Sequence, residues 1–333
     1  MYIKELRARG FRCFADTTVE FQPGLNVVIG ENNAGKTALL RALGLVFQRE
    51  GRRSITRHDF HHSPSVDTSL PPSIEVRVTL ASSDADTEAD KALVATWLTR
   101  LEDSWEAELT YRFALPDPYH EEFCQRRDRG AGDPNERYWR AVEWLLPKFV
   151  GRTYAGSDVA EIRAEPDALS KFDFQFLDAI RDAESQMLTG RSPLLRRMLG
   201  LVLDNSEEHQ DPESRGRNER EFKQQADQLP THLQARVDTE SLFRLIDDTG
   251  AGAGGRLSLS GALAEGDILT ALGLLVSGTN ASLPVSHNGL GYNNLIYVSL
   301  VLASLRFTSR RYEGDNEKLF PMLVVEEPEA ALP

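Results

Sequence analysis

The sequence has few cysteines, no long apolar run and no excess of positive charge. Cysteine occurs 2 times in 333 residues, too few for a disulfide framework, and no CxxC metal motif is present. The longest apolar run, residues 295–305, carries Tyr297 and serines and is shorter than the ~20 residues that cross a bilayer. The N-terminus lacks the apolar stretch of a signal peptide. We therefore expect a cytoplasmic protein with no membrane partner.

The net charge is −13 at pH 7. DNA attracts basic surfaces, so this charge argues against a protein whose whole surface is built for nucleic acid, although it leaves room for a local basic groove. Arginine-rich stretches at 52–58 and 191–197 are candidates for such a groove, and ordinary surface charge is the simpler explanation. The histidines 58, 61 and 62 match no standard metal-site spacing, so we interpret them as a solvated loop.

Apolar patterning predicts strands and one helix in the first third of the chain. Alternation of apolar and polar residues predicts strands at 2–9, 17–21, 74–80 and 109–114. The continuous apolar run at 25–29 is typical of a short strand buried on both faces. From Lys36, apolar residues recur at helical spacing.

The middle of the chain, residues 85–265, is polar and expected to be mainly helical. Helical patterns occur at 136–146, 172–187, 193–203 and 222–247. A glycine-rich stretch at 250–255 marks a boundary. After it, strands are expected at 269–276 and 319–325, with a helix at 294–305 between them. The chain stops soon after the last strand, so we expect a fragment of a longer protein.

Residues 30–37 match the phosphate-binding pattern G-x-x-x-x-G-K-[ST]. Backbone N–H groups of such a loop, here around Gly30, Asn33 and Gly35, form an anion nest at a helix N-terminus. Lys36 adds a positive charge for the β- and γ-phosphates, and the Thr37 hydroxyl is expected on Mg²⁺. The sequence therefore predicts an ATP and Mg²⁺ site, and a glycine-rich turn that binds nothing is the alternative.

The last expected strand ends in two acids, Glu326 and Glu327. A carboxylate at such a strand end can lie beside a phosphate loop, and we assign Glu326 to Mg²⁺ and Glu327 to the attacking water. Alone this pattern is weak, since many strands end in acids. Nearly the whole chain separates these acids from Lys36, and so long an insertion is typical of the SMC/RecF-like branch of P-loop ATPases.

Residues 286–294, Ser-His-Asn-Gly-Leu-Gly-Tyr-Asn-Asn, precede the apolar helix. Small residues at a helix N-terminus make an anion site. In ABC-type ATPases such a signature loop caps the γ-phosphate on the partner subunit, which predicts an ATP-linked homodimer. Ser286 and Asn288 both qualify for the usual signature serine, and a simple helix cap is the alternative.

These elements predict an α/β fold of the ABC/SMC-like P-loop NTPase class, with a mixed sheet and a helical insertion. We expect an N-terminal ATPase lobe at 1–84 and a mainly helical insertion at 85–265, serving as an arm or dimerisation element. A C-terminal ATPase lobe at 266–333 would carry the signature-like and acidic motifs.

The chain resembles the N-terminal ATPase part of the Old (overcoming lysogenisation defect) family of ATP-dependent endonucleases. The resemblance is carried by residues 9–14 (RGFRCF), 30–37, 289–297 (GLGYNNLIY) and 326–330 (EEPEA), with 177–182 as a further landmark.

This resemblance implies that Arg12 lies near the nucleotide, although a solvent-exposed turn arginine is the alternative. It implies that Asn288, Gly289 and Gly291 contact the ATP of the opposite subunit. It also implies DNA as a partner of the full-length protein, a Toprim nuclease domain beyond Pro333, and an accessory defence protein.

The sequence departs from the family after EEPEA, where HLHP is common and Ala331-Leu332-Pro333 stands here. No Q-loop glutamine can be placed, and Asp59 is near where a Mg²⁺-side residue would be sought.

Two other functions stay open. The first is a RecF- or SMC-like repair ATPase that binds DNA without cutting it. The second is a module that binds ATP only to assemble and does not hydrolyse it. A transporter ATPase fits less well, because the long insertion and the EEPEA ending do not suit it.

Overall fold

The computed structural model describes residues 1–48, 55–63, 68–84, 86–102, 104–129, 133–156, 162–177, 187, 194–203, 212–229, 232, 236, 265–277, 282–310 and 320–327. Backbone contacts group the chain into two units. Unit 1 is Met1–Asp178 with Arg311–Glu326, and unit 2 is Ala179–Arg310 with Glu327–Pro333. This grouping differs from the three-part division expected from the sequence, which stays a prediction.

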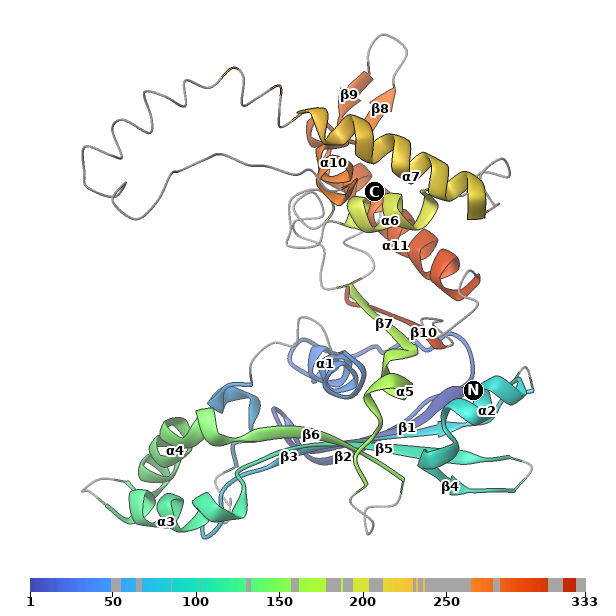
Figure 1. Ribbon diagram of the computed structural model, residues 1–333. Coiled ribbons are helices and arrows are strands. Elements are labelled where there is room, and N and C mark those ends of the chain that lie inside the picture. The colour runs from blue at the N-terminus through green and yellow to red at the C-terminus, as the bar shows by residue number, and fades with distance from the viewer. Residues whose placement is uncertain are drawn as a thin grey trace, which may run out of the picture. The chain divides into compact units, whose positions relative to one another are not determined.

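Unit 1 is built around a 6-stranded antiparallel sheet in the order β2-β1-β3-β5-β4, with β6 also paired to β5 (Figure 1). Its strands are β1 (Tyr2–Phe11), β2 (Phe14–Glu20), β3 (Ile74–Ala81), β4 (Leu98–Arg100), β5 (Glu106–Ala114) and β6 (Val150–Ala155). Strands β1, β2, β3 and β5 confirm the strands expected at 2–9, 17–21, 74–80 and 109–114. Strands β4, β5 and β6 all lie within the range 85–265 that was expected to be mainly helical, and of these three only β5 was expected as a strand.

Alternate side chains of this sheet point into the core. In β3, the apolar residues at every second position from Ile74 to Leu80 are buried, whereas Glu75 and Arg77 between them are half-buried on the other face. This two-residue period is the geometry of a strand with one apolar face. The core also takes in Leu6 and Ala8 of β1.

Helix α1 (Lys36–Phe47) buries one side against this core, as expected from its spacing. Its inward residues include Leu39, Val46 and Phe47. Phe47 stacks on Phe172 at 5.3 Å between ring centroids. The helix therefore joins the large sheet to a second, smaller one.

The smaller sheet pairs β7 (Phe172–Leu177) with β10 (Phe320–Val325) in parallel. The strand expected at 319–325 is confirmed, but the helix expected at 172–187 is wrong over residues 172–177. Phenylalanine at 172, 174 and 176 has the two-residue period of a strand. The remainder of that range lies outside the described residues except Met187.

The buried strand expected at 25–29 is also wrong. The described backbone there forms no strand, and Leu25, Val27 and Ile29 are 90%, 74% and 87% exposed. An apolar, β-branched run becomes a strand only where a neighbour supplies ladder hydrogen bonds and burial. In the part of the chain that the structure describes, no strand pairs with these residues.

The other described elements of unit 1 include one helical hairpin and two short helices. Helices α3 (His120–Asp128) and α4 (Pro134–Leu145) pack together, and α4 confirms the helix expected at 136–146. Helix α2 (Glu88–Leu93) follows β3, and α5 (Pro166–Ser170) precedes β7.

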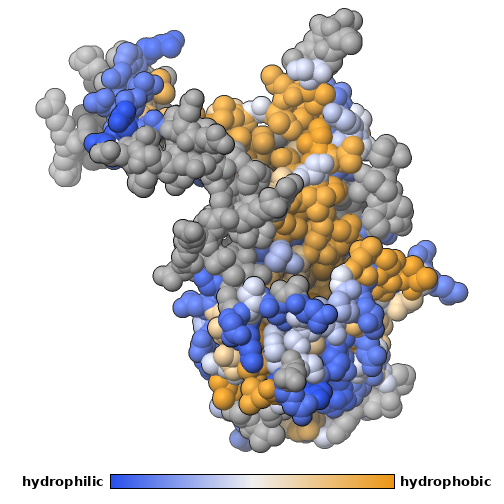
Figure 2. All heavy atoms as spheres, turned by 90° about the vertical axis from the view of Figure 1, so that its right-hand side faces the viewer, coloured by the Kyte–Doolittle hydropathy of each residue, from blue (hydrophilic) through white to orange (hydrophobic). Residues whose placement is uncertain are grey.

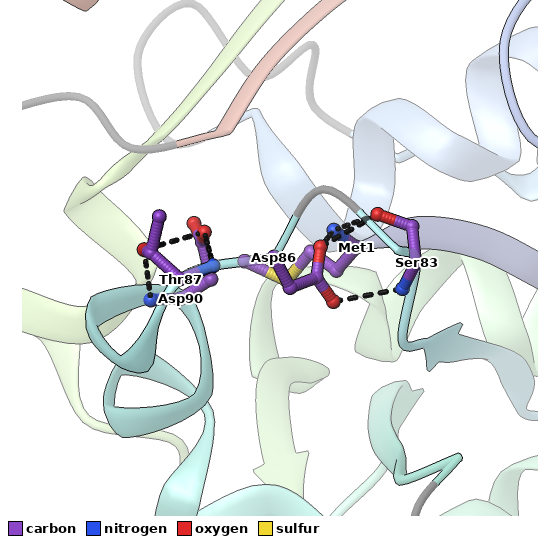
Figure 3. A network of polar contacts seen from close by, with 5 residues as sticks. All are labelled: Met1, Ser83, Asp86, Thr87 and Asp90. Carbon is purple, nitrogen blue, oxygen red and sulfur yellow. Dashed lines mark hydrogen bonds and ion pairs between the residues drawn. The ribbon is translucent and has the colours of Figure 1, made fainter.

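The start of β1 is fastened to the segment before α2 (Figure 3). The Met1 amine donates to Ser83 Oγ at 3.2 Å and to Asp86. Burial lowers the pKa of this amine. Thr87 and Asp90 close the adjoining helix with a capping box.

The described part of unit 2 consists of helices and a short hairpin. It contains α6 (Leu194–Val202), α7 (Pro212–Ala226), α10 (Glu265–Ala271), β8 (Leu275–Ser277), β9 (Ser282–Pro284) and α11 (Leu290–Arg310). The helices expected at 193–203 and 294–305 are confirmed by α6 and α11. The strand expected at 269–276 is wrong for the most part, because α10 continues to Ala271 and β8 begins only at Leu275.

Helix α7 ends at Ala226, so it covers only the first residues of the helix expected at 222–247. Most of the remaining range, and the glycine-rich boundary at 250–255, lie outside the described residues. Among the helices that are described, none combines the length and apolarity needed to cross a membrane.

Candidate nucleotide-binding site

The phosphate-loop motif leads directly into α1. Gly35, the last residue before the helix, has φ 97 and ψ 8, and Asn33 has φ 66. These left-handed conformations let the loop curl before the helix starts. No side chain caps the helix, and its first turn holds no acid. Its first N–H groups are therefore suited to an anion.

The Lys36 ammonium group lies over the same loop. Nζ donates to the carbonyl oxygens of Gly30 at 2.7 Å and Glu31 at 2.9 Å. The loop's own backbone thus holds the positive charge at the place where the motif predicts phosphate. Phosphate oxygens are stronger acceptors than these carbonyls, because an anionic acceptor strengthens the hydrogen bond.

The structure brings Thr37 and Glu326 together from opposite ends of the sequence. Thr37 lies in the first turn of α1, and Glu326 follows β10 directly. The Thr37 hydroxyl donates to Glu326 Oε1. The backbone N–H of Glu326 donates to Leu177 O at 2.8 Å, which fixes the strand end beside β7.

Glu326 also has an oxygen that is buried and unsatisfied. No described atom forms a hydrogen bond with Oε2. A buried carboxylate oxygen without a partner is costly, and a hard cation or its bound water would satisfy it. Mg²⁺ takes oxygen ligands such as a carboxylate and a hydroxyl. Thr37 and Glu326 therefore fit the predicted metal site.

Glu327 is exposed and has φ 50, which is unusual for a residue other than glycine. The backbone therefore turns sharply directly after Glu326. The role of Glu327 toward the attacking water stays a prediction.

The signature-like residues lie at the start of α11, in unit 2. A short turn, Val285–His287, precedes the helix, and Asn288 Nδ2 donates to Val285 O at 3.2 Å. The N–H groups of Tyr292 and Asn293 donate to Gly289 O at 3.1 Å each. Those bonds agree with the helix-cap alternative, and the expected contacts of Asn288, Gly289 and Gly291 with ATP stay predictions.

Helix α11 also presents apolar side chains to solvent. Leu290, Leu295 and Leu302 are 71%, 41% and 50% exposed. Hydrophobic surface, orange in Figure 2, is visible on the face shown there.

Arg12 is held by Asp59 in the structure. Its Nε and Nη2 donate to Asp59 Oδ1 at 3.0 and 2.7 Å. Asp59 is 7% exposed. Burial alone would raise the pKa of Asp59, but hydrogen bonds from Thr56 and Arg12 outweigh it and hold the pKa below its usual value. The predicted contact of Arg12 with nucleotide is not tested by this pair.

The remaining candidates from the sequence have ordinary surroundings. Arg57 Nη1 donates to Glu143 at 3.0 Å, and His62 stacks on Trp139 at 3.9 Å. Within the described ranges, no group of three His, Cys, Asp or Glu residues is arranged to hold a metal. Arg52, Arg53 and Arg191 lie outside those ranges.

Comparison with known proteins connects this geometry to ATPases. Residues 1–113 match the AAA ATPase domain family. The chain is 34% identical over 88 residues to the chromosome partition protein Smc of Mycolicibacterium paratuberculosis, covering 25% of this chain and 7% of that protein. It is 45% identical over 56 residues to the DNA replication and repair protein RecF of Streptococcus uberis, covering 17% and 15%. The match thus spans only a small part of either relative.

One solved structure is similar to part of this chain. It comes from work described as structural biochemistry of ATP-driven dimerization and DNA stimulated activation of SMC ATPases. The match covers 50% of this chain and 83% of that chain, with 17% identity and a TM-score of 0.24, too low to support an argument. The domain match and the mixed α/β architecture confirm the expected fold class. The chain has an ABC/SMC-like P-loop NTPase fold, its residues 1–113 match an ATPase domain, and short parts of it are similar to Smc and RecF.

Proposed function

We propose that this chain binds ATP with Mg²⁺ and hydrolyses it, as the ATPase part of an Old-like DNA endonuclease. The observation that carries the ATPase part is the contact between Thr37 and Glu326, whose second carboxylate oxygen is buried and has no hydrogen-bond partner among the described residues. This pair lies at the start of the helix that follows the phosphate loop.

Each residue has a separate part in the proposed reaction. Lys36 leaves the carbonyl oxygens of Gly30 and Glu31 and donates to the β- and γ-phosphates. Thr37 and Glu326 hold Mg²⁺, which when bound neutralises charge on the phosphates. Glu327 orients the attacking water and accepts its proton.

The proposed assembly is an ATP-linked homodimer that acts on DNA. The start of α11 would supply Asn288, Gly289 and Gly291 to the ATP of a second copy. Relatedness to Smc and RecF, a chromosome partition protein and a DNA replication and repair protein, supports a role with DNA. An accessory defence protein as a further partner belongs to the same proposal.

The endonuclease part rests on the EEPEA and signature-like sequences. The RecF similarity favours a second function, a repair ATPase that does not cut DNA. Assays of the full-length protein for DNA cleavage and DNA binding distinguish the two functions. Metal-dependent cleavage of DNA would support the endonuclease, whereas ATP-dependent DNA binding without cleavage would support the repair ATPase.

Steady-state ATP turnover tests the proposed hydrolysis. Glu327→Gln should bind ATP normally and lose turnover about 100-fold or more, because general-base catalysis contributes on that scale. Glu106→Gln is the matched control, since Glu106 forms a partly exposed ion pair with Lys4 at 2.6 Å that joins β5 to β1 in the large sheet. If the unsubstituted chain binds ATP but never hydrolyses it, and Glu327→Gln behaves identically, the protein is an assembly module.

A further inference from the structure

We propose that Asp59 is a positioning residue for the nucleotide site. It acts through the hairpin turn, residues 11–14 between β1 and β2, which packs against the end of the phosphate loop. This inference rests on the proposed ATP binding.

The hairpin turn contacts the phosphate loop at Gly35. A methyl group built on Gly35 would lie 2.7 Å from Cys13 Sγ and 3.2 Å from the Phe14 ring. Phe14 is 9% exposed and belongs to the core of unit 1. Lys36 follows Gly35 directly, so the position of the turn helps to set where the first N–H groups of α1 point.

Asp59 fastens this turn through both backbone and side chain. Its carbonyl accepts from the Arg12 N–H at 2.8 Å, and its Oδ1 accepts twice from the Arg12 guanidinium, at 2.7 and 3.0 Å. Arg12 has φ 49, a conformation that costs roughly 1–2 kcal/mol for a residue with a side chain. The bonds to Asp59 offset that cost and hold the turn in its unusual shape.

Asp59 is itself fixed. Its Oδ2 accepts from Thr56 N at 2.9 Å and Thr56 Oγ1 at 3.0 Å. On its other side, His61 N donates to Gly10 O at 2.9 Å, and His61 Nδ1 lies 2.7 Å from Arg12 O. Phe60, which lies between Asp59 and His61 and is 1% exposed, forms an isolated β-bridge with Phe11. Residues 56–61, which are far from the hairpin turn in sequence, therefore hold the turn in place.

The support from residues 56–61 matters for ATP because the phosphate loop has few other supports. Residues 30–34 are exposed, and the Lys36 side chain bonds only within the loop in the described contacts. A loop that must present several N–H groups to one phosphate loses affinity when its end shifts. Removing the Asp59 carboxylate should therefore weaken ATP binding without removing any atom that touches ATP.

The test compares Asp59→Asn with Asp16→Asn. Asp16 pairs with Arg7 at 2.8 and 2.7 Å on the same β1–β2 hairpin, but on the exposed sheet face. Asp59→Asn should weaken ATP binding about tenfold, the scale of one charge-assisted hydrogen bond, whereas Asp16→Asn should leave the ATP Kd unchanged.

The alkylation rate of Cys13 reports on the turn itself. Cys13 is free and exposed, and Cys124→Ser removes the other thiol of the chain. In that background, Asp59→Asn should raise the Cys13 alkylation rate, and Asp16→Asn should not. A merely structural loss would lower the melting temperature without this selective change at Cys13 and in the ATP Kd.

Several results would overturn the proposal. Asp59→Asn that folds and binds ATP as tightly as the unsubstituted chain removes the positioning role. Tighter binding removes it too, because it would mean that Asp59 keeps Arg12 away from ATP. Should Asp59→Asn fail to fold, Phe14→Leu decides, and an unchanged ATP Kd there counts against the proposal. If the unsubstituted chain binds no ATP, the proposed function itself fails.

Discussion

Helices α1 and α11 each begin directly after a glycine, and the surroundings of the two glycines contrast. At α1, Gly35 packs against the hairpin turn, Lys36 bonds to the loop and Thr37 bonds to Glu326. At α11, a methyl group on Gly289 would meet no atom of the described residues within 4 Å, and Leu290 is 71% exposed.

The contrast shows which of the two helix starts is surrounded by bonded polar side chains of its own unit. The start of α1 already has a lysine bonded to the phosphate loop and a hydroxyl bonded to a half-buried carboxylate. The start of α11 has backbone caps and open space in front of them. This difference suits the proposal that α1 binds the ATP of its own chain, whereas α11 serves ATP that a second copy brings.

The largest effect is expected at the lysine. Lys36→Ala removes several charge-assisted hydrogen bonds to phosphate, each worth about 1.5–3 kcal/mol, and should weaken ATP binding about 100-fold. Lys4→Ala is the control, because Lys4 lies in an exposed ion pair on β1 and such pairs contribute little. Calorimetric titration with ATP compares the two, and equal affinities for both variants would mean that α1 is not the nucleotide site.

Paired glycine substitutions test the contrast directly. Gly35→Ala places a methyl group 2.7 Å from Cys13 Sγ at φ 97, which should cost roughly 1–2 kcal/mol from the backbone alone and weaken ATP binding. Gly289→Ala enters open space and should change stability by less than about 0.5 kcal/mol. It should leave the ATP affinity of the single chain unchanged and reduce ATP-linked self-association.

Thermal melts, ATP titrations and sedimentation with ATP measure these three outcomes. If Gly289→Ala weakens ATP binding by the single chain as much as Gly35→Ala does, the two helix starts do not differ in the way described.

The sequence predicted the local parts of the site better than the surroundings. The position of Lys36 and Thr37 at a helix start could be predicted because loop and helix start lie within one short motif, and their roles toward ATP and Mg²⁺ stay predictions. Strands β1, β2, β3 and β5 of the large sheet were predictable from their two-residue period, whereas β4 and β6 were not predicted. Phenylalanine at 172, 174 and 176 carried the same signal, but the helical pattern read over a longer range concealed it.

Other features have no local sequence signal. Residues 25–29 have strand composition, yet burial depends on a neighbouring strand that composition does not specify. The pair of Arg12 and Asp59 joins positions 47 apart, which only the fold brings together. The left-handed backbone at Arg12 likewise depends on bonds made by a distant segment.

The smallest expected effect is a change in how the thermal stability of the chain depends on pH. The pKa of Asp59 is lowered in the folded chain, so its contribution to stability is fully present above the ordinary value of 3.8 and is lost as pH falls through the lowered value. Melting temperatures between pH 7 and pH 3 should therefore fall less steeply for Asp59→Asn.

Salt separates this effect from that of the exposed pair. The pKa of Asp16 is also lowered, by its hydrogen bond from Arg7, but both partners are exposed and salt screens them. At high salt the Asp16→Asn difference should vanish, and the Asp59→Asn difference should persist because Asp59 is buried. If high salt abolishes the melting-temperature differences of both variants, salt screens the Arg12–Asp59 pair as strongly as an exposed ion pair.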